Sequence, residues 1–298
     1  MRMPRIIGEY RNGTYDVAIF EDGTKERYSK DGVFQAAFAE SMDVTISERC
    51  SVGCPFCYAG CTERGRRADI FSYKFLETLH PYTEMAIGGN DLENPQIEPF
   101  LKFLKEKKVI ANMTVNQKDL MSHRELIERW LSEELIHGIG ISLVNPDKEL
   151  IGFVQSNPNA VIHTVCGIVT HEQMEKLADK GVKVLILGYK HKGRGDRYYT
   201  EHVSDIAERT KELDRELSEW EKRFEVIAFD NLALEQLNVR EKMSPEKWNE
   251  IYMGDEGTST FYIDLVNGTY AKSSLESSGF PILEDVDNMF ANIQTQIR

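Results

Sequence analysis

Four of the five cysteines in this sequence stand close together, in a loop that follows a short apolar stretch. They are Cys50, Cys54, Cys57 and Cys61, whereas Cys166 stands alone. A structural zinc site usually draws two ligands from each of two separated segments, and the chain has no second Cys-x2-Cys or His-x3-His pair. Three thiolates spaced Cys-x3-Cys-x2-Cys in one loop instead suit an iron–sulfur cluster with one iron left open. A zinc site and a plain electron-transfer cluster are the alternatives.

The cysteine loop resembles the signature loop of the radical S-adenosylmethionine (SAM) superfamily. Its spacing matches, the aromatic Phe56 precedes the last cysteine, and the loop follows the first strand of an expected α/β repeat. The resemblance implies that Cys50, Cys54 and Cys57 bind three irons of a 4Fe-4S cluster, and that the fourth iron chelates SAM. It also implies reductive cleavage of SAM to a 5′-deoxyadenosyl radical, which abstracts hydrogen from a substrate. The implied electron donor is a flavodoxin or ferredoxin.

A second segment supports this resemblance. Gly88, Gly89, Asn90 and Asp91 follow the second expected strand, where the superfamily commonly has Gly-Gly-Glu. Glycines let the backbone approach the SAM ammonium closely, and neighbouring carbonyl or carboxylate oxygens accept its hydrogen bonds. The chain departs from the family pattern by placing Asn90 where Glu is usual, and Asp91 is the candidate replacement for that acid. With Phe56, these residues form the expected SAM-binding site.

Polar residues also follow the later strands, at the edge where the loops of a barrel converge. In the superfamily, residues at these positions commonly contact the ribose and carboxylate of SAM. By position alone, the candidates are Asn116 and Gln117 after the third strand, Ser142 and Asn145 after the fourth, and Gly167, Thr170 and His171 after the fifth.

The elements that position these residues are predicted from hydrophobic periodicity. Apolar runs alternate with amphipathic stretches, which indicates a parallel sheet with crossover helices. The runs are nearly continuous, which is typical of strands in a sheet buried on both faces. The expected strands are Val44–Ile46, Met85–Ile87, Met113–Val115, Ile139–Leu143, Val161–Val165, Val182–Leu187 and Val226–Phe229. The expected helices are Gln96–Lys107, His123–Glu133, Asp147–Gln155, His171–Asp179 and Glu201–Lys222.

The fold class is therefore α/β, as a partial (β/α)6 TIM-like barrel with additions at both ends. Residues 1–40 carry the hairpin signals Asn12-Gly13 and Asp22-Gly23 and are expected to form a β meander. Residues 41–240 are expected to form the radical SAM barrel, and residues 241–298 a C-terminal cap.

The cap is expected to contain a hairpin that turns at Asn267-Gly268, followed by a helix over Leu283–Ile297. The hairpin is similar to the SPASM or twitch extension of peptide-modifying radical SAM enzymes. Those extensions bind auxiliary clusters through cysteines, and this one has none. The resemblance thus implies a clusterless cap.

Composition narrows the classes of function. The net charge of −13 argues against a broad nucleic-acid interface. No apolar run approaches the roughly 18 residues of a membrane helix, and the first ten residues carry charges where a signal peptide is apolar. The cysteines are too crowded for a secreted disulfide framework. We therefore expect a cytoplasmic protein without membrane association.

Four features allow more than one interpretation. The basic loop from Lys190 to Arg197 is either solvated or grips a substrate anion over the barrel mouth. Cys61 is a second metal ligand, a group acting on substrate, or an ordinary turn residue. Cys166 is a buried inert thiol or faces the substrate. Arg64, Arg66 and Arg67 are expected in solvent or against an acidic electron donor.

Two substrate classes are open. A peptide or protein side chain is favoured by the cap's likeness to peptide-modifying enzymes. A small nucleoside or nucleotide is favoured by the compact barrel and the basic loop. The rival from another class is a non-enzymatic iron–sulfur or zinc-binding module, which needs no SAM-like second motif.

Overall fold

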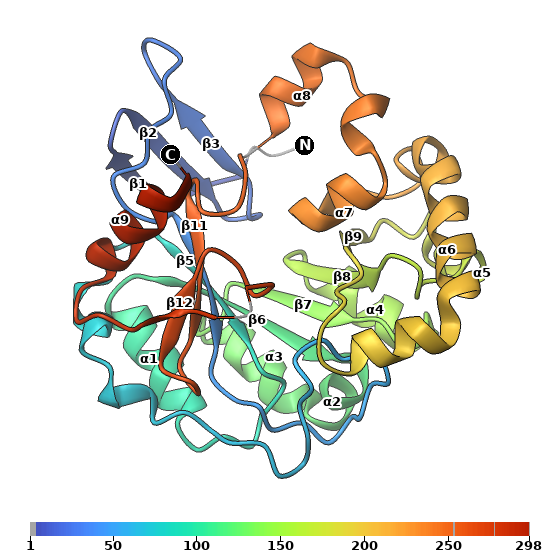
Figure 1. Ribbon diagram of the computed structural model, residues 1–298, viewed down its shortest axis with the longest axis horizontal. Coiled ribbons are helices and arrows are strands. Elements are labelled where there is room, and N and C mark those ends of the chain that lie inside the picture. Colours follow the sequence, from blue (N-terminus) through green and yellow to red (C-terminus); the bar gives the residue numbers. More distant parts are fainter. Residues whose placement is uncertain (1–3, 253, 277, 298) are drawn as a thin grey trace.

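The chain folds into two β-sheets, with helices packed around the larger one (Figure 1). The computed structural model describes residues 4–252, 254–276 and 278–297. Within these residues the smaller sheet has three strands in the order β1-β2-β3. The larger has ten, in the order β10-β9-β8-β7-β6-β5-β4-β11-β12-β13. The molecule is of the α/β class, with a large, mostly parallel sheet.

Seven strands of the large sheet lie side by side in chain order, each parallel to the next. They are β4 (Ser41–Thr45), β5 (Glu84–Gly88), β6 (Ile110–Asn116), β7 (Gly138–Ser142), β8 (Ala160–Val165), β9 (Lys183–Leu187) and β10 (Val226–Phe229). The helices between them are α1 (Ile97–Glu106), α2 (Gln117–Ser122), α3 (Arg124–Ser132), α4 (Lys148–Ser156), α5 (His171–Leu177) and α6 (Arg194–Trp220). The alternation of strand and helix that the sequence predicts is confirmed.

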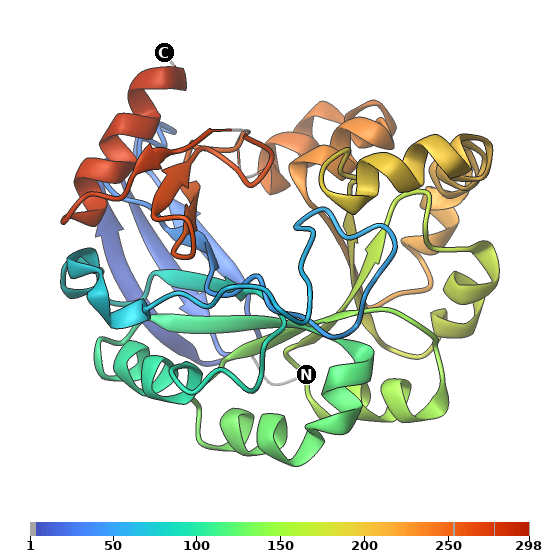
Figure 2. The same ribbon diagram turned by 60° about the horizontal axis from the view of Figure 1, so that its bottom comes forward.

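One connection differs from the others. Between β4 and β5 the chain forms the cysteine loop and two short 3-10 helices, η1 (Ile70–Ser72) and η2 (Lys74–Thr78), in place of an α-helix. Figure 2 shows this blue loop rising between the red C-terminal hairpin and the yellow helix α6. The loop therefore meets segments that are far from it in the sequence.

The two faces of the large sheet are covered differently. On the outer face, alternate residues such as Ile87 and Ile141 are buried beneath the helices. On the inner face the intervening residues are accessible to solvent, and Asp43 is exposed although its strand is central. The prediction of a sheet buried on both faces is wrong, because inner-face residues such as Ala86 and Ser142 stay partly accessible to solvent.

The C-terminal segment is joined to the large sheet. Strand β11 (Thr260–Asp264) pairs parallel with β4, from Thr260 opposite Ser41 to Asp264 opposite Thr45. The expected hairpin forms between β11 and β12 (Thr269–Ala271), and its turn contains Gly268 at φ +68°. Short β13 (Phe280–Pro281) and helix α9 (Val286–Ile297) follow. Although the sequence suggests a separate appendage, the hairpin extends the main sheet beyond β4.

Some helix bounds differ from those that hydrophobic periodicity predicted. Helix α6 begins at Arg194, earlier than expected, and is kinked at His202, where φ is −131°. The glycines around Arg194 suggested a loop instead. Helices α7 (Asn231–Gln236) and α8 (Pro245–Ile251), with the 3-10 helix η3 (Val239–Lys242), lie in segments for which no helix was expected. Among the described residues, no helix has the length and apolarity needed to cross a membrane.

The N-terminal meander consists of β1 (Ile6–Asn12), β2 (Tyr15–Phe20) and β3 (Lys25–Tyr28), with glycines at positive φ in both expected turns. It attaches to the main sheet through Glu40, a fully buried carboxylate just before β4. Tyr15 Oη donates to Glu40 over 2.5 Å, and Arg27 Nε donates over 2.8 Å. The Lys25 ammonium lies 3.5 Å from the same carboxylate.

Candidate functional site

The cysteine loop is closed at its base by backbone hydrogen bonds. Cys50 N donates to Thr62 O over 2.9 Å, and Thr62 N donates to Glu48 O over 3.1 Å. At the tip, Cys57 N donates to Cys54 O and Gly60 N to Cys57 O, each over 3.2 Å. These bonds fix the path of the loop, so the three cysteines of the motif are held by main-chain contacts.

All five cysteines are free thiols. Cys50, Cys54 and Cys57 are partly exposed, whereas Cys61 and Cys166 are buried. The sulfurs of Cys50, Cys54 and Cys57 do not all lie within 4.8 Å of one another. A tetrahedral ion with metal–sulfur bonds of about 2.3 Å would hold its thiolates roughly 3.8 Å apart. The arrangement is therefore wider than a mononuclear zinc site requires.

Two asparagines from neighbouring strand ends direct amide groups at these sulfurs. Asn90 Nδ2 lies 3.5 Å from Cys50 Sγ, and Asn116 Nδ2 lies 3.8 Å from Cys54 Sγ. The asparagines are themselves joined, because Asn116 N donates to Asn90 Oδ1 over 2.8 Å. Asn90 also donates to Asp119 in helix α2. Thus the structure brings two residues of the expected SAM site together with two of the expected metal ligands.

The thiols differ in acidity. A hydrogen bond from Cys61 lowers the pKa of Cys57 to about 5, with help from the positive charge of Arg194. The same contact raises the pKa of Cys61. Burial, and then the neighbouring Cys57 and Cys50, raise the pKa of Cys54. Crowded, partly buried thiols repel one another when ionised, and a bound cation would relieve that repulsion.

The glycines after β5 allow a close backbone approach. Gly89 has φ +89°, and a Cβ at this position would lie 2.6 Å from Ser47 O. The next acid, Asp91, is buried and points back toward the base of the cysteine loop. It accepts from Ser47 Oγ over 2.8 Å and from Arg67 Nε over 2.6 Å. Asp91 and Arg67 therefore tie β5 to the loop, and the expectation that Arg67 lies free in solvent is wrong.

The remaining candidates are dispersed. Phe56 packs edge-on against Tyr198 of α6, with ring centroids 5.9 Å apart. Ser142 pairs in register with Asn116 and His163 on the inner face. Gln117 is turned into the loop after β7, where its Oε1 accepts from Asn145 N over 2.8 Å.

Two further candidate residues stabilise helix α5 or the packing of α6. Thr170 caps α5 through its hydroxyl, which accepts from Gln173 N. Gly167 has φ +72° and lies against Ile206 of α6. Neither contact leads to the cysteine loop.

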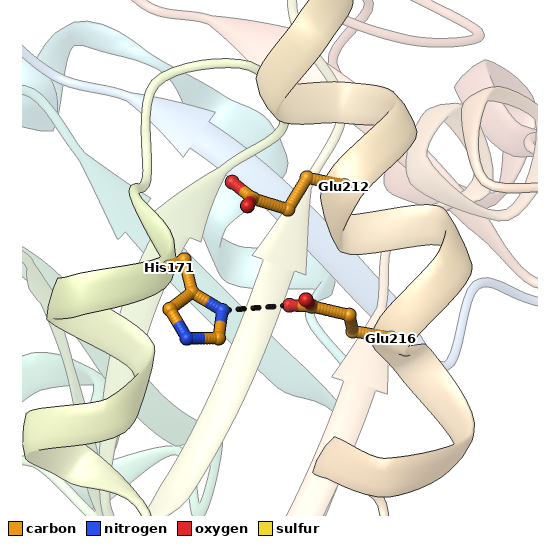
Figure 3. A group of neighbouring side chains, drawn as sticks. All are labelled: His171, Glu212 and Glu216. Carbon is orange, nitrogen blue, oxygen red and sulfur yellow. Dashed lines mark hydrogen bonds and ion pairs between the residues drawn. The ribbon is translucent and has the colours of Figure 1, made fainter.

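His171 lies on the outer surface, away from the inner face. Its Nδ1 is 2.8 Å from a carboxylate oxygen of Glu216, and Glu212 points toward the same place from α6 (Figure 3). Among the described residues, these three form the one group whose ligand atoms all lie within 4.8 Å. Hydrogen bonding to Glu216 raises the pKa of His171. A histidine–glutamate ion pair between two helices explains this group without a metal.

Three basic residues of the loop after β9 form hydrogen bonds with other parts of the chain. Lys190 Nζ donates to Ser274 Oγ over 2.9 Å, and Lys192 Nζ to Ser274 O over 2.8 Å. Arg194 Nε donates to Cys54 O over 2.9 Å and its Nη1 to Cys61 O over 2.7 Å. Of the two interpretations of this loop, neither a solvated segment nor an anion grip describes it. It holds the cysteine loop against the C-terminal segment.

A pocket opens beside Cys50. It encloses about 600 Å³, its open mouth included, and most of its lining residues are polar or charged. The lining residues are Arg49, Cys50, Ser51, Glu63, Asn90, Asp91, Leu92, Glu93, Asp119 and His123. Sequence reasoning missed Asp119, although it stands one helical turn after Asn116. It placed Arg194 in the basic loop but did not foresee its bonds to the cysteine loop.

Comparisons with known proteins identify no family. No family model and no curated protein matches the chain. Solved structures of tryptophan synthase from Mycobacterium tuberculosis are similar at low level. The form in space group F222 has a TM-score of 0.32 and 9% identity, covering 68% of this chain and 90% of that chain. An aminoacrylate-bound form has a TM-score of 0.31 and 10% identity, with 69% and 87% covered. Similarity at this level supports no inference about function.

Proposed function

We propose that the chain is a radical SAM enzyme that holds a 4Fe-4S cluster through Cys50, Cys54 and Cys57. The observation that carries the proposal is the set of three free, partly exposed thiols on one loop, with amide donors at two of them. Hydrogen bonds to cluster sulfurs are a common means of tuning reduction potential. The sulfur spacing, too wide for one ion, suits a group in which each thiolate binds a different metal atom.

The topology supports the proposal as well. Seven parallel strands in chain order form a curved sheet, with the cysteine loop directly after the first of them. We interpret this arrangement as a partial (β/α)6 barrel extended by one strand on one side and by the C-terminal hairpin on the other. In parallel α/β folds, reactive groups gather where the strands end, and the cysteines, Asn90, Asn116 and Ser142 all lie at such ends.

The chain's own residues have separable roles in this proposal. When bound, the cluster and SAM supply the electron transfer and the radical that abstracts hydrogen from a substrate. Asn90 and Asn116 orient and stabilise the thiolates. Arg194 fixes the loop through two carbonyls. The pocket beside Cys50 offers Asn90 and Asp119 as acceptors for the ammonium of SAM. Gly89 lets the end of β5 pack closely against Ser47 at the base of the cysteine loop.

The substrate is a peptide side chain or a small molecule, and the electron donor is a flavodoxin or ferredoxin. The engagement of Lys190, Lys192 and Arg194 in internal bonds removes the main reason for preferring a nucleotide. The alternative is a non-enzymatic iron–sulfur or zinc-binding module, which would bind metal through the same cysteines but would not cleave SAM.

Anaerobic reconstitution with iron and sulfide tests the ligand assignment. We expect about four irons per chain, and a loss of most cluster iron and absorbance when Cys50, Cys54 or Cys57 is changed to Ala. Cys166→Ala removes a buried thiol outside the loop and is the matched control, which should load normally. If Cys54→Ala retained full cluster content, the assignment would be wrong.

A further inference from the structure

The side-chain amide of Asn90 is held in one orientation by two separate contacts. Its oxygen accepts from the backbone N–H of Asn116 over 2.8 Å, and its nitrogen donates to the carboxylate of Asp119. A backbone N–H can only donate and an ionised carboxylate can only accept, so both contacts require the same orientation of the amide. The amide nitrogen is thereby directed at Cys50 Sγ, which lies 3.5 Å away.

Asn116 and Asp119 belong to one turn of helix α2, directly after strand β6. Asn116 caps the helix, since its Oδ1 accepts from Lys118 N over 3.0 Å. The backbone oxygen of Asp119 accepts from His123 N over 2.9 Å and lies 3.0 Å from His123 Nδ1. The turn that carries the carboxylate is therefore fixed at both ends. It supplies both of the contacts that orient Asn90.

The acid next to Asn90 in the chain does not share this role. Asp91 is buried, and its carboxylate accepts from Ser47 and Arg67. The carboxylate that contacts Asn90 instead comes from the neighbouring strand end and is partly exposed on the wall of the pocket beside Cys50. Without it, the amide nitrogen would keep only the sulfur as an acceptor among the described residues, and thiol sulfur is a weak acceptor.

We propose that Asp119 is a positioning residue that holds the Asn90 amide toward Cys50 and thereby sets the reduction potential of the bound cluster. The inference rests on the proposed function, because it needs a cluster at Cys50. A hydrogen bond to a thiolate sulfur stabilises the more negative, reduced state and raises the reduction potential. The carboxylate itself acts in the opposite direction, because a nearby negative charge disfavours reduction. The two contributions of Asp119 therefore differ in sign and can be separated.

A double-mutant cycle on the reduction potential tests this proposal. The four reconstituted full-length proteins are the unmodified chain, Asp119→Ala, Asn90→Ala and the double variant. Each is titrated anaerobically without SAM, at matched iron content, and the reduced cluster is followed by electron paramagnetic resonance. The unmodified cluster and the three variants give the effect of Asp119→Ala with and without the Asn90 amide.

The expected result is an effect of Asp119→Ala that depends on Asn90. When the amide is present, the substitution removes the charge and also frees the amide. In the Asn90→Ala background it removes only the charge, so it should raise the potential more there. The difference between the two effects should be about threefold or more in the equilibrium constant for reduction, which is roughly 30 mV for one electron.

Two further substitutions separate positioning from charge. Asp119→Asn removes the charge but keeps a side-chain oxygen that can accept from Asn90, so its potential should lie above that of Asp119→Ala. Asp119→Leu fills the space without an acceptor and replaces Asp119→Ala if that variant takes up no cluster. Glu93→Ala is the matched control, because Glu93 lines the same pocket without a hydrogen bond to Asn90 among the described residues. Its effect should be equal with and without the amide.

Two results would overturn the proposal: an effect of Asp119→Ala that is equal in both backgrounds, or equal potentials for Asp119→Asn and Asp119→Ala. SAM cleavage measured on the same preparations separates this proposal from the proposed function. Cleavage together with an additive cycle would remove only the role of Asp119. A non-additive cycle without SAM cleavage would remove only the radical function, and a chain that takes up no cluster would remove both.

Discussion

At the scale of single residues, the contact between Cys57 and Cys61 decides how the cysteine loop reacts. Cys57 is partly exposed and Cys61 is buried beneath it. The Cys61 thiol donates and so favours the Cys57 thiolate. Because the thiolate is the form that binds metal and attacks electrophiles, Cys57 is expected to be the most reactive thiol of the metal-free protein near neutral pH.

Alkylation of the metal-free, reduced protein checks this expectation. Cys57 should reach half-maximal reactivity with iodoacetamide near its pKa of about 5. Loss of the donor in Cys61→Ala should move that midpoint upward by about one pH unit or more. The measurement is the modification rate of each cysteine by mass spectrometry across pH, with Cys166→Ala as the unchanged control. A Cys57 profile that Cys61→Ala leaves in place would contradict the contact.

Residue spacing singled out the cysteine set, and the resemblance to the radical SAM superfamily singled out Asn90 and Asn116, but neither could supply their partners. Nothing in the sequence pairs Arg67 with Asp91, because that contact depends on how the loop base folds against β5. The same holds for Arg194, whose carbonyl acceptors are more than a hundred residues away in the chain. Short sequence motifs indicate which residues are candidate metal ligands, whereas the contacts that support those residues depend on tertiary packing.

At the scale of elements, the β9–α6 loop and the cysteine loop are locked together at Gly193. This residue has φ +58°, and a Cβ would lie 2.3 Å from Tyr58 O. Arg194 N, next in the chain, donates to Cys57 O over 3.0 Å. A side chain at position 193 would therefore push the two loops apart and weaken the hold on the cysteines.

We expect Gly193→Ala to lower cluster loading after reconstitution, measured as iron and sulfide per chain. Gly181→Ala is the matched control, since Gly181 has φ +62° but a Cβ there would have no neighbour within 4 Å. Both substitutions place a side chain at positive φ, at a cost on the order of 1–3 kcal/mol of unfolding free energy each, so the unfolding free energy of each variant is measured beside its iron content. Equal cluster content in the two variants would show that the loop contact does not support the site.

Hydrophobic periodicity predicted the parallel strands and most of the helices, because elements with one buried face give a regular pattern of apolar residues in the sequence. It failed at Arg194–Tyr199, where glycine and polar residues begin a helix that is held by contacts with the cysteine loop. It also overestimated burial of the inner face. Strands with one open face and strands with two buried faces can share the same apolar content when the open positions are small.

At the scale of the whole molecule, Glu40 joins the meander to the main sheet. Burial raises the pKa of Glu40, but the Arg27 hydrogen bond and the charges of Lys25 and Arg27 outweigh burial, so the pKa lies below its ordinary value of 4.5. A lowered folded-state pKa means that the contribution of Glu40 to stability is present above pH 4.5 and is lost as the pH falls through the folded pKa.

Glu40→Gln should lower the free energy of unfolding near neutral pH by on the order of 3 kcal/mol, because it removes the buried charge that pairs with Arg27 and Lys25, although Lys25 keeps its ion pair with Glu84. The difference from the unmodified protein should shrink at acidic pH, where Glu40 itself becomes neutral. Urea unfolding at several pH values measures both effects. Glu9→Gln, on the exposed face of the same meander, should change stability by no more than about 0.5 kcal/mol. A difference that does not depend on pH would exclude the charge as its cause.

The overall chain order of the sheet was predictable, but its edges were not. Parallel pairing of β11 with β4 joins residues about two hundred positions apart, and no local pattern marks such a partner. This pairing places Tyr262 beside Asp43 on the inner face of the sheet, so the C-terminal segment is an integral part of the sheet.

The most direct test of the proposed function is formation of 5′-deoxyadenosine. The reconstituted protein is incubated anaerobically with SAM and a strong reductant, and the products are measured by liquid chromatography and mass spectrometry. We expect 5′-deoxyadenosine and methionine from the unmodified protein, and neither above background from Cys54→Ala. A fully loaded cluster that neither binds nor cleaves SAM would contradict the assignment of this chain as a radical SAM enzyme.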